Sequence, residues 1–244
     1  MTYFINNINQ KIAYKYIRGK SPGIIFIHGL NSDMNGKKAL SIEKYAKKNK
    51  LSFLRFDCRG NGKSFGKFQN FTIADWKKDL IDLIDNVTKG PQILIGSSMG
   101  GWLMMLAAKM RKKRICGLIG LAAAADFGNH MYSNLSKKSK KELKIKGTTK
   151  IHSKNFSYTL SKKFFLEAKK NKILDKPFIF NKPFILIHGL KDSVVNYKMP
   201  QKIMNNTKGN NIQIQYLKSS DHRLSEKNDL MSINNTITLV RSLI

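Results

Sequence analysis

The turn around Ser98 is the feature of the sequence that most directly suggests chemistry. The segment GSSMG (96–100) has the pattern G-x-S-x-G and lies between two apolar runs. A tight turn from strand to helix forces its central residue into an unfavourable backbone conformation and excludes side chains two positions away, which explains both glycines. Ser97 would have Ile95 and Met99 at those positions. We therefore expect Ser98 to be an exposed nucleophile, and the amides of the following helix to favour negative charge beside it.

A serine hydroxyl needs a base to become a nucleophile, and the chain has five histidines. His28 and His188 each end an apolar run in the sequence IHGL, where we expect a structural role or backbone hydrogen bonding. His130 and His152 lie in a lysine-rich segment and are expected to be solvated. His222, in SSDHRLSE after the last expected strand, is the candidate general base.

An acid is needed to hold the imidazole in the right tautomer and to stabilise its protonated form. Asp192, in IHGLKDSVV, follows an expected strand and precedes His222, so that serine, aspartate and histidine occur in the chain order typical of a G-x-S-x-G turn. Asp126, at the end of the preceding expected strand, is the alternative acid, and Asp221 is expected to point away from its neighbour His222.

Two backbone amides complete the expected site. In FIHGLNSDMNG (26–36) the N–H of Leu30 follows an early strand and can face the nucleophile. The N–H of Met99, directly after Ser98, is the second donor. Together they predict an oxyanion hole, and the site as a whole requires neither a metal nor an organic cofactor.

Short apolar runs alternate with helical patterns along most of the chain. Strands are expected at 11–17, 23–29, 51–57, 91–96, 115–123, 183–189 and 212–217, and helices at 37–50, 72–87, 100–112 and 226–243. Continuous apolar runs are typical of parallel strands covered on both faces. The alternation therefore predicts a single α/β domain with a mostly parallel central sheet flanked by helices.

The segment 127–176 interrupts this alternation. It has no strand-like run, is dense in lysine and contains several helix-capable pieces. An ordinary crossover is the alternative, but a length of about 50 residues is far beyond that of a usual loop. We expect a helical cap inserted over the carboxyl edge of the sheet, which divides the domain (1–244) into a core of 1–126 and 177–244 and a cap of 127–176.

The formal net charge of +30 raises nucleic acid as a partner. The excess is mostly lysine, accompanied by abundant asparagine and isoleucine throughout, which indicates a compositional bias of the genome. No zinc spacing, aromatic RNA-binding signature or basic region leading into heptads accompanies the charge. We therefore expect no nucleic-acid partner.

The cysteines and the lengths of the apolar runs indicate the cellular compartment of the protein. Cys58 and Cys116 are isolated in the sequence and are expected to be buried thiols in a reducing compartment. The start of the chain lacks the patterns of a secretory signal or a transit peptide. No apolar run approaches the roughly 20 residues that span a bilayer. We expect a cytoplasmic protein without a membrane span.

A resemblance to a known family extends these inferences. FDCRGNGKS (56–64) is similar to the Asp-x-Arg-Gly-x-Gly-x-Ser loop common in α/β-hydrolases, and the chain resembles that superfamily over nearly its full length. Six segments, in order, resemble the animal mitochondrial acyl-protein thioesterases that also hydrolyse acyl glucuronides. They are MNGKKALSIEKYAKK, DWKKDLIDLID, PQILIGSSMGGWLM, LIGLAAAADF, LIHGLKDSVV and SDHRLSEKNDL.

The resemblance implies a serine hydrolase acting on carboxylic esters or acyl thioesters, with Ser98, Asp192 and His222 at the family's triad positions. Such an enzyme passes through an acyl-enzyme intermediate that water then hydrolyses. The substrate is expected to be a small acyl ester or thioester or an acylated protein. A protein that binds a ligand or partner on a hydrolase scaffold without turnover is the alternative.

Overall fold

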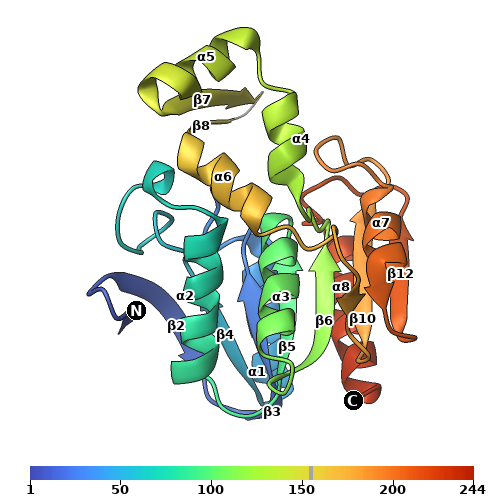
Figure 1. Ribbon diagram of the computed structural model, residues 1–244. Helices are drawn as coiled ribbons and strands as arrows, with labels where there is room; N and C mark the ends of the chain where they lie inside the picture. The colour runs from blue at the N-terminus through green and yellow to red at the C-terminus, as the bar shows by residue number, and fades with distance from the viewer. Residues whose placement is uncertain (154–155) are drawn as a thin grey trace.

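The computed structural model describes residues 1–153 and 156–244. Its centre is an eight-stranded sheet with the order β1-β2-β4-β3-β5-β6-β10-β12 (Figure 1). These strands are β1 (Thr2–Ile5), β2 (Lys11–Ile17), β3 (Lys20–Ile27), β4 (Leu51–Phe56), β5 (Gln92–Ser97), β6 (Ile115–Leu121), β10 (Phe184–Gly189) and β12 (Ile212–Leu217). β2 pairs antiparallel with β1 and β4, and the pairs from β4 to β12 are parallel.

The parallel strands form because their apolar runs are buried on both faces. Every residue of β4, β5, β6 and β10 is buried, as the continuous apolar runs predict. β12, which alternates in sequence, is half-buried at one edge of the sheet. In register, Ile27 lies beside Gly96 and Ser97 beside Leu121, so the carboxyl ends of β3, β5 and β6 meet at one edge.

Helices cover both faces of the sheet. α1 (Lys37–Lys48) and α8 (Lys227–Ser242) pack against one face, and α2 (Ile73–Asn86) and α3 (Met99–Met110) against the other. α7 (Met199–Asn206) follows β10 and packs beside it. No helix in the described ranges is long and apolar enough to cross a membrane.

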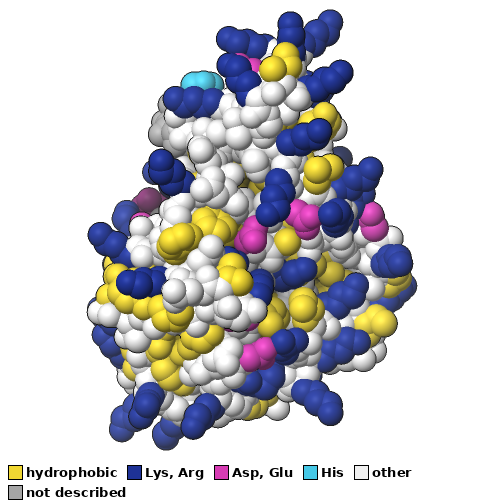
Figure 2. Space-filling view, turned by 60° about the vertical axis from the view of Figure 1, so that its left-hand side comes forward, with side chains coloured by type: hydrophobic (Ala, Val, Ile, Leu, Met, Phe, Trp, Pro, Cys, Tyr) yellow, Lys and Arg dark blue, Asp and Glu magenta, His cyan; other side chains and the backbone are white. Residues whose placement is uncertain are grey.

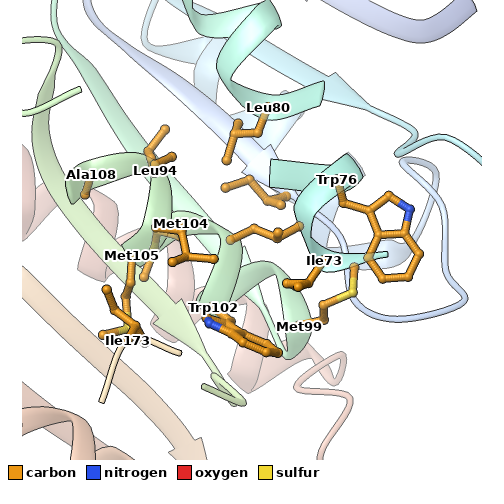
Figure 3. Packing of buried hydrophobic residues seen from close by; sticks show 14 of the residues in the cluster. Ile73, Trp76, Leu80, Leu94, Met99, Trp102, Met104, Met105, Ala108 and Ile173 are labelled. Carbon is orange, nitrogen blue, oxygen red and sulfur yellow. The ribbon is translucent and has the colours of Figure 1, made fainter. Parts of the chain in front are cut away.

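The start of α2 follows from local sequence. Thr72 and Asp75 form a capping box, in which the Asp75 carboxylate accepts a hydrogen bond from the Thr72 N–H at 2.9 Å. The helix then buries Trp76 and Leu80 at helical spacing in a cluster that includes residues of α3, and Figure 3 shows Trp76 beside Met99 of α3. This packing fixes α3, and with it the turn that carries Ser98.

The insertion between β6 and β10 contains α4 (Phe127–Ser133), α5 (Lys137–Lys146), β7 (Thr148–Ser153), β8 (Phe156–Ser161) and α6 (Lys162–Lys170). It lies beyond the carboxyl edge of the sheet (Figure 1). Two short strands, β9 (Phe178–Ile179) and β11 (Thr207–Lys208), pair with each other, and the 3-10 helix η1 spans Phe68–Asn70.

The expectation that segment 127–176 has no strand was wrong, because β7 and β8 form an antiparallel pair. In FSYTLS aromatic and aliphatic residues alternate with serine and threonine, and Tyr158 is half-buried while Leu160 is buried. In TTKIHS the buried Thr149 precedes the half-buried Ile151 by two positions. Both segments are otherwise hydrophilic and neither is an apolar run, so composition alone does not indicate a strand.

Candidate active site

Ser98 lies at the junction of β5 and α3 in a strained conformation. Its φ of 52° and ψ of −117° are unusual for a residue with a side chain. A Cβ at Gly96 would overlap the carbonyl oxygen of Gly100, and one at Gly100 would overlap that of Ile27. Both glycines are therefore required for α3 to approach the sheet this closely, and the approach turns the Ser98 side chain outward.

His222 lies in the loop between β12 and α8, and its ring bridges the other two candidate residues. Its Nε2 is 3.1 Å from Ser98 Oγ, and its Nδ1 is 2.8 Å from Asp192 Oδ2. The carboxylate can only accept, so Nδ1 carries the hydrogen and the Nε2 lone pair faces the serine hydroxyl. The His222 side chain is 22% exposed, which leaves it accessible to substrate.

Asp192 follows β10 and has a fully buried side chain. Its Oδ1 accepts hydrogen bonds from the N–H groups of Val194 and Val195, both at 2.8 Å. Burial opposes ionisation, but His222 and the two amides outweigh that cost and hold the pKa of Asp192 below its ordinary value. The carboxylate is thus ionised and oriented toward the imidazole.

The alternative acid, Asp126, is engaged elsewhere. Its carboxylate accepts hydrogen bonds from the N–H groups of Ile173 and Leu174, at 2.9 and 2.8 Å, where the insertion returns to the core. Burial raises the pKa of this carboxyl. Asp221 accepts from the N–H of Arg223 at 2.8 Å, and no hydrogen bond joins it to the His222 ring in the described part of the chain.

The strand-end histidines make the expected backbone hydrogen bonds. His28 Nδ1 lies 2.7 Å from the carbonyl oxygen of Gly29, and its Nε2 accepts from the N–H of Cys58 at 3.0 Å. His188 Nε2 lies 3.0 Å from the carbonyl oxygen of Val195. Burial lowers the pKa of both histidines, so both rings are neutral.

Two contacts that support the site were not expected from the sequence. His188 Nε2 is also 3.4 Å from Asp192 Oδ2, and the four-residue spacing between the two was the only signal for this contact. Lys38 Nζ of α1 donates to the carbonyl oxygen of Arg223 and so holds the loop that carries His222 on the side of the sheet covered by α1 and α8. Burial lowers the pKa of Lys38 to about 8.

The two segments that carry the expected oxyanion-hole amides pass close to the nucleophile. A Cβ on Gly29 would be 3.3 Å from Ser98 Cβ, so the loop that carries Leu30 passes directly over the serine. Met99 is the first residue of α3. Among the hydrogen bonds described for 1–153 and 156–244, neither amide N–H has an acceptor. Two free donors beside a nucleophile and a base fit acyl transfer through an oxyanion.

The residues in the described ranges include no group of three or more histidine, cysteine, aspartate or glutamate side chains that could hold a metal ion.

Comparison with known proteins identifies the family. Residues 21–176 match the family model described as serine aminopeptidase, S33. The chain is 40% identical over 229 residues to the mitochondrial palmitoyl-protein thioesterase ABHD10 of Homo sapiens, covering 93% of this chain and 75% of the relative. It is 35% identical, with a TM-score of 0.92, to the structure of α/β-hydrolase domain-containing protein 10 from mouse, covering 100% and 99% of the two chains.

A structure of an Agrobacterium vitis hydrolase has a TM-score of 0.91 at 24% identity, which supports the fold. The curated relatives correct one expectation. Those of Pongo abelii, Homo sapiens and Bos taurus are all named as mitochondrial, which contradicts the cytoplasmic location expected from the sequence. The comparisons also give no support to a non-catalytic binding protein. The chain belongs to the α/β-hydrolases of the serine aminopeptidase S33 family and, within it, to the group of ABHD10, and it is a serine hydrolase that cleaves esters or thioesters.

Proposed function

We propose that the chain removes long-chain acyl groups from proteins by thioester hydrolysis, with Ser98 as nucleophile, His222 as general base and Asp192 as the acid that orients it. The observation that carries the proposal is the chain of hydrogen bonds from Ser98 Oγ through both nitrogens of His222 to Asp192. The activity in the names of relatives that are 39 and 40% identical supports an acylated protein as substrate.

In the acylation step, Ser98 Oγ attacks the thioester carbonyl carbon and its proton passes to His222 Nε2. The negative charge that develops on the carbonyl oxygen accepts hydrogen bonds from the N–H groups of Leu30 and Met99. Asp192 stabilises the imidazolium. The carbon–sulfur bond then breaks, the thiol leaves with the proton from Nε2, and the acyl group stays on Ser98 as an ester.

In the deacylation step, a water molecule occupies the place of the thiol. His222 takes its proton as the water oxygen attacks the acyl carbon, and the same two amides stabilise the second oxyanion. Collapse returns the proton to Ser98 Oγ and releases the carboxylic acid. An oxygen ester passes through the same steps, with an alcohol as leaving group.

The helix that follows the nucleophile contributes core packing. Met99 and Trp102 are fully buried, and the indole of Trp102 packs edge-on against Phe127 of α4 at 5.5 Å between ring centroids. These side chains pack between α2 and the insertion, so the insertion lies against the helix that follows Ser98. We propose on this ground that segment 127–176 acts as a cap that shelters the site.

The test is the hydrolysis of matched ester and thioester series, from acetyl to palmitoyl, by the wild type, Ser98→Ala and Ser97→Ala. Ser97→Ala is the matched control because it removes the neighbouring hydroxyl without touching the triad. We expect the wild type and the control to cleave long-chain thioesters most efficiently. Ser98→Ala should lose at least about 10⁴-fold in kcat, because nucleophile and base act as a unit.

Labelling with a fluorophosphonate reports on the triad separately from the substrate. Labelling of the wild type that disappears in Ser98→Ala and His222→Gln supports Ser98 as nucleophile. Cleavage of short esters alone, still dependent on Ser98, would leave the triad and remove the long-chain substrate. Hydrolysis that persists in Ser98→Ala contradicts the proposal.

A further inference from the structure

A groove of about 890 Å³ opens on the cap between α4, α5 and α6, and no residue of the candidate triad lines it. We call it the cap groove. Its floor is apolar, since Leu143 and Phe165 are only 3% and 8% exposed. Tyr132 and Leu166 form apolar walls that are 45% and 52% exposed. The volume lies in the range of sites that take up a partner's side chains or a small ligand, about 300–1,000 Å³.

Five lysines also line the cap groove, and no acidic side chain does. They are Lys140, Lys141, Lys144, Lys162 and Lys169. None of the five belongs to an ion pair found between residues of the described ranges. Figure 2 shows dark-blue side chains crowding the upper part of the molecule, with yellow apolar side chains between them.

The acidic residues of these helices have other partners. Glu142 of α5 accepts a hydrogen bond from Thr149 Oγ1 at 2.8 Å, and Glu167 of α6 pairs with Lys170 at 2.8 Å. The cap groove therefore places five lysines that lack an acidic partner among the described residues around an apolar floor.

The end of α6, which lines the cap groove, is connected to α3, the helix that begins after the nucleophile. The indole N–H of Trp102 donates to the carbonyl oxygen of Asn171 at 3.0 Å, and Lys169 stands two residues before Asn171. Trp102 in turn lies about one helical turn beyond Ser98. We therefore expect a protein substrate whose acyl group lies at Ser98 to contact the cap groove with another part of its surface.

We propose that the cap groove docks an acidic amphipathic helix of the protein from which the acyl group is removed. This proposal rests on the proposed function. Leucine-like side chains of the helix insert over Leu143 and Phe165, and its carboxylates meet the lysines of the rim. A concave groove with a buried apolar floor accommodates a helix, whereas the flat surface of a bilayer does not reach that floor. Five charges also match several carboxylates better than the single one of a fatty acid.

Direct binding tests the proposal without turnover. Ser98→Ala is titrated against a fluorescent amphipathic helical peptide with glutamate on its polar face, at physiological ionic strength. The groove variant adds Lys141→Gln, Lys144→Gln and Lys162→Gln. The matched control adds Lys89→Gln, Lys112→Gln and Lys113→Gln, which removes the same charge from exposed lysines outside the cap groove.

We expect the groove variant to raise Kd about tenfold, because it loses three partly screened charge pairs whose free energies add. The control should change Kd less than about twofold. Leu166→Ser should weaken binding separately, because it removes an apolar wall. A scrambled peptide of the same composition should bind the parent protein more weakly. Equal weakening by the groove and control variants would overturn the proposal in favour of overall charge.

Catalysis supplies the second readout. In proteins with an intact Ser98, the groove variant should lower kcat/KM about tenfold for a palmitoyl thioester carried on the acidic peptide and leave a short neutral ester unchanged. Peptide binding in the absence of thioester hydrolysis would reject the proposed function and keep the docking site. Binding of palmitate or of phosphatidylglycerol vesicles that depends on the same lysines, without peptide binding, would overturn the docking proposal.

Discussion

Asp192 receives hydrogen bonds on both carboxylate oxygens before His222 takes up a proton. Two amides hold Oδ1, while His222 and His188 approach Oδ2 at 2.8 and 3.4 Å. This compensation lets a buried carboxylate stay ionised, and it leaves the imidazole as the group whose protonation controls activity. The arrangement predicts both the pH dependence of the reaction and the effect of changing His188.

The acid side of the pH profile should show no protonation of Asp192 in the usual range of an aspartate. Burial opposes ionisation of this carboxyl, but its hydrogen bonds hold its pKa below the ordinary value, so it stays ionised as the pH falls through that range. Log kcat/KM for a short ester should therefore not fall with a slope greater than one above about pH 5. The measurement is initial rate against pH at low substrate concentration. A slope of two above pH 5 would mean that Asp192 protonates in the same range, which contradicts the assignment.

Replacing His188 should lower activity through Asp192. The neutral ring donates from Nε2 toward Val195 and Asp192, so His188→Leu leaves the buried carboxylate with less compensation. The value of kcat/KM for a short ester should fall several-fold, while His188→Gln, which keeps a donor, should restore it. His28→Gln is the matched control because His28 ends the other IHGL segment. An equal loss of activity in the control would assign the effect to packing.

At this scale the sequence was enough to nominate a candidate site. Ser98, Asp192 and His222 could be nominated because their chain order is restrictive, and that order already favoured Asp192 over Asp126. The fold adds the hydrogen bonds from Ile173 and Leu174 to Asp126, which depend on the path of the insertion. The contact of His188 with Asp192 depends on the loop after β10, whose shape no local pattern encodes.

The turn between β5 and α3 is the element on which the site depends. Gly100→Ala would press a methyl group into the carbonyl of Ile27 and push α3 away from β3. We expect the free energy of unfolding to fall by about 3 kcal/mol, as for overpacked cores, and fluorophosphonate labelling to slow. Denaturant unfolding and labelling rate measure the two effects. Gly36→Ala is the control, since nothing lies within 4 Å of its added Cβ, and comparable damage there would contradict this account.

Elements with strong apolar periodicity were predicted well, and short ones on the surface were not. The expected strands 11–17 and 212–217 coincide with β2 and β12, and α2 and α8 agree with expectation to within about a residue at each end. The β7–β8 hairpin, β1 and α7 were missed. Each is short and packs against the rest of the molecule through few side chains, so tertiary contacts rather than local pattern decide its conformation.

The ion pairs of Glu43 link three elements and make stability depend on pH. Lys15 of β2, Lys47 of α1 and Arg55 of β4 approach this carboxylate at 2.9, 2.8 and 2.7 Å. Burial opposes its ionisation, but the three cations outweigh that cost and lower its pKa to about 2. The stabilisation is therefore fully present above the ordinary pKa of 4.5 and is lost as the pH falls toward 2.

Glu43→Gln should lower the free energy of unfolding by about 3 kcal/mol at pH 7, and by progressively less as the pH falls below 4.5. Urea unfolding across this pH range measures the difference between variant and wild type. Glu167→Gln, which removes a partner of the exposed Lys170, should cost less than about 1 kcal/mol at any pH. A pH-independent difference for Glu43→Gln would show that packing, not charge, stabilises this position.

The net charge of +30 acts on the molecule as a whole through repulsion among exposed lysines. Salt screens charges separated by more than about 10 Å at 0.1 M ionic strength, but hardly affects buried pairs such as Arg59 with Asp79, 2.6 Å apart. Screening should thus remove more repulsion than attraction. Tm should rise by several degrees between about 0.01 and 0.3 M sodium chloride, followed by circular dichroism. A constant or falling Tm would mean that repulsion among the lysines does not limit the stability of the fold.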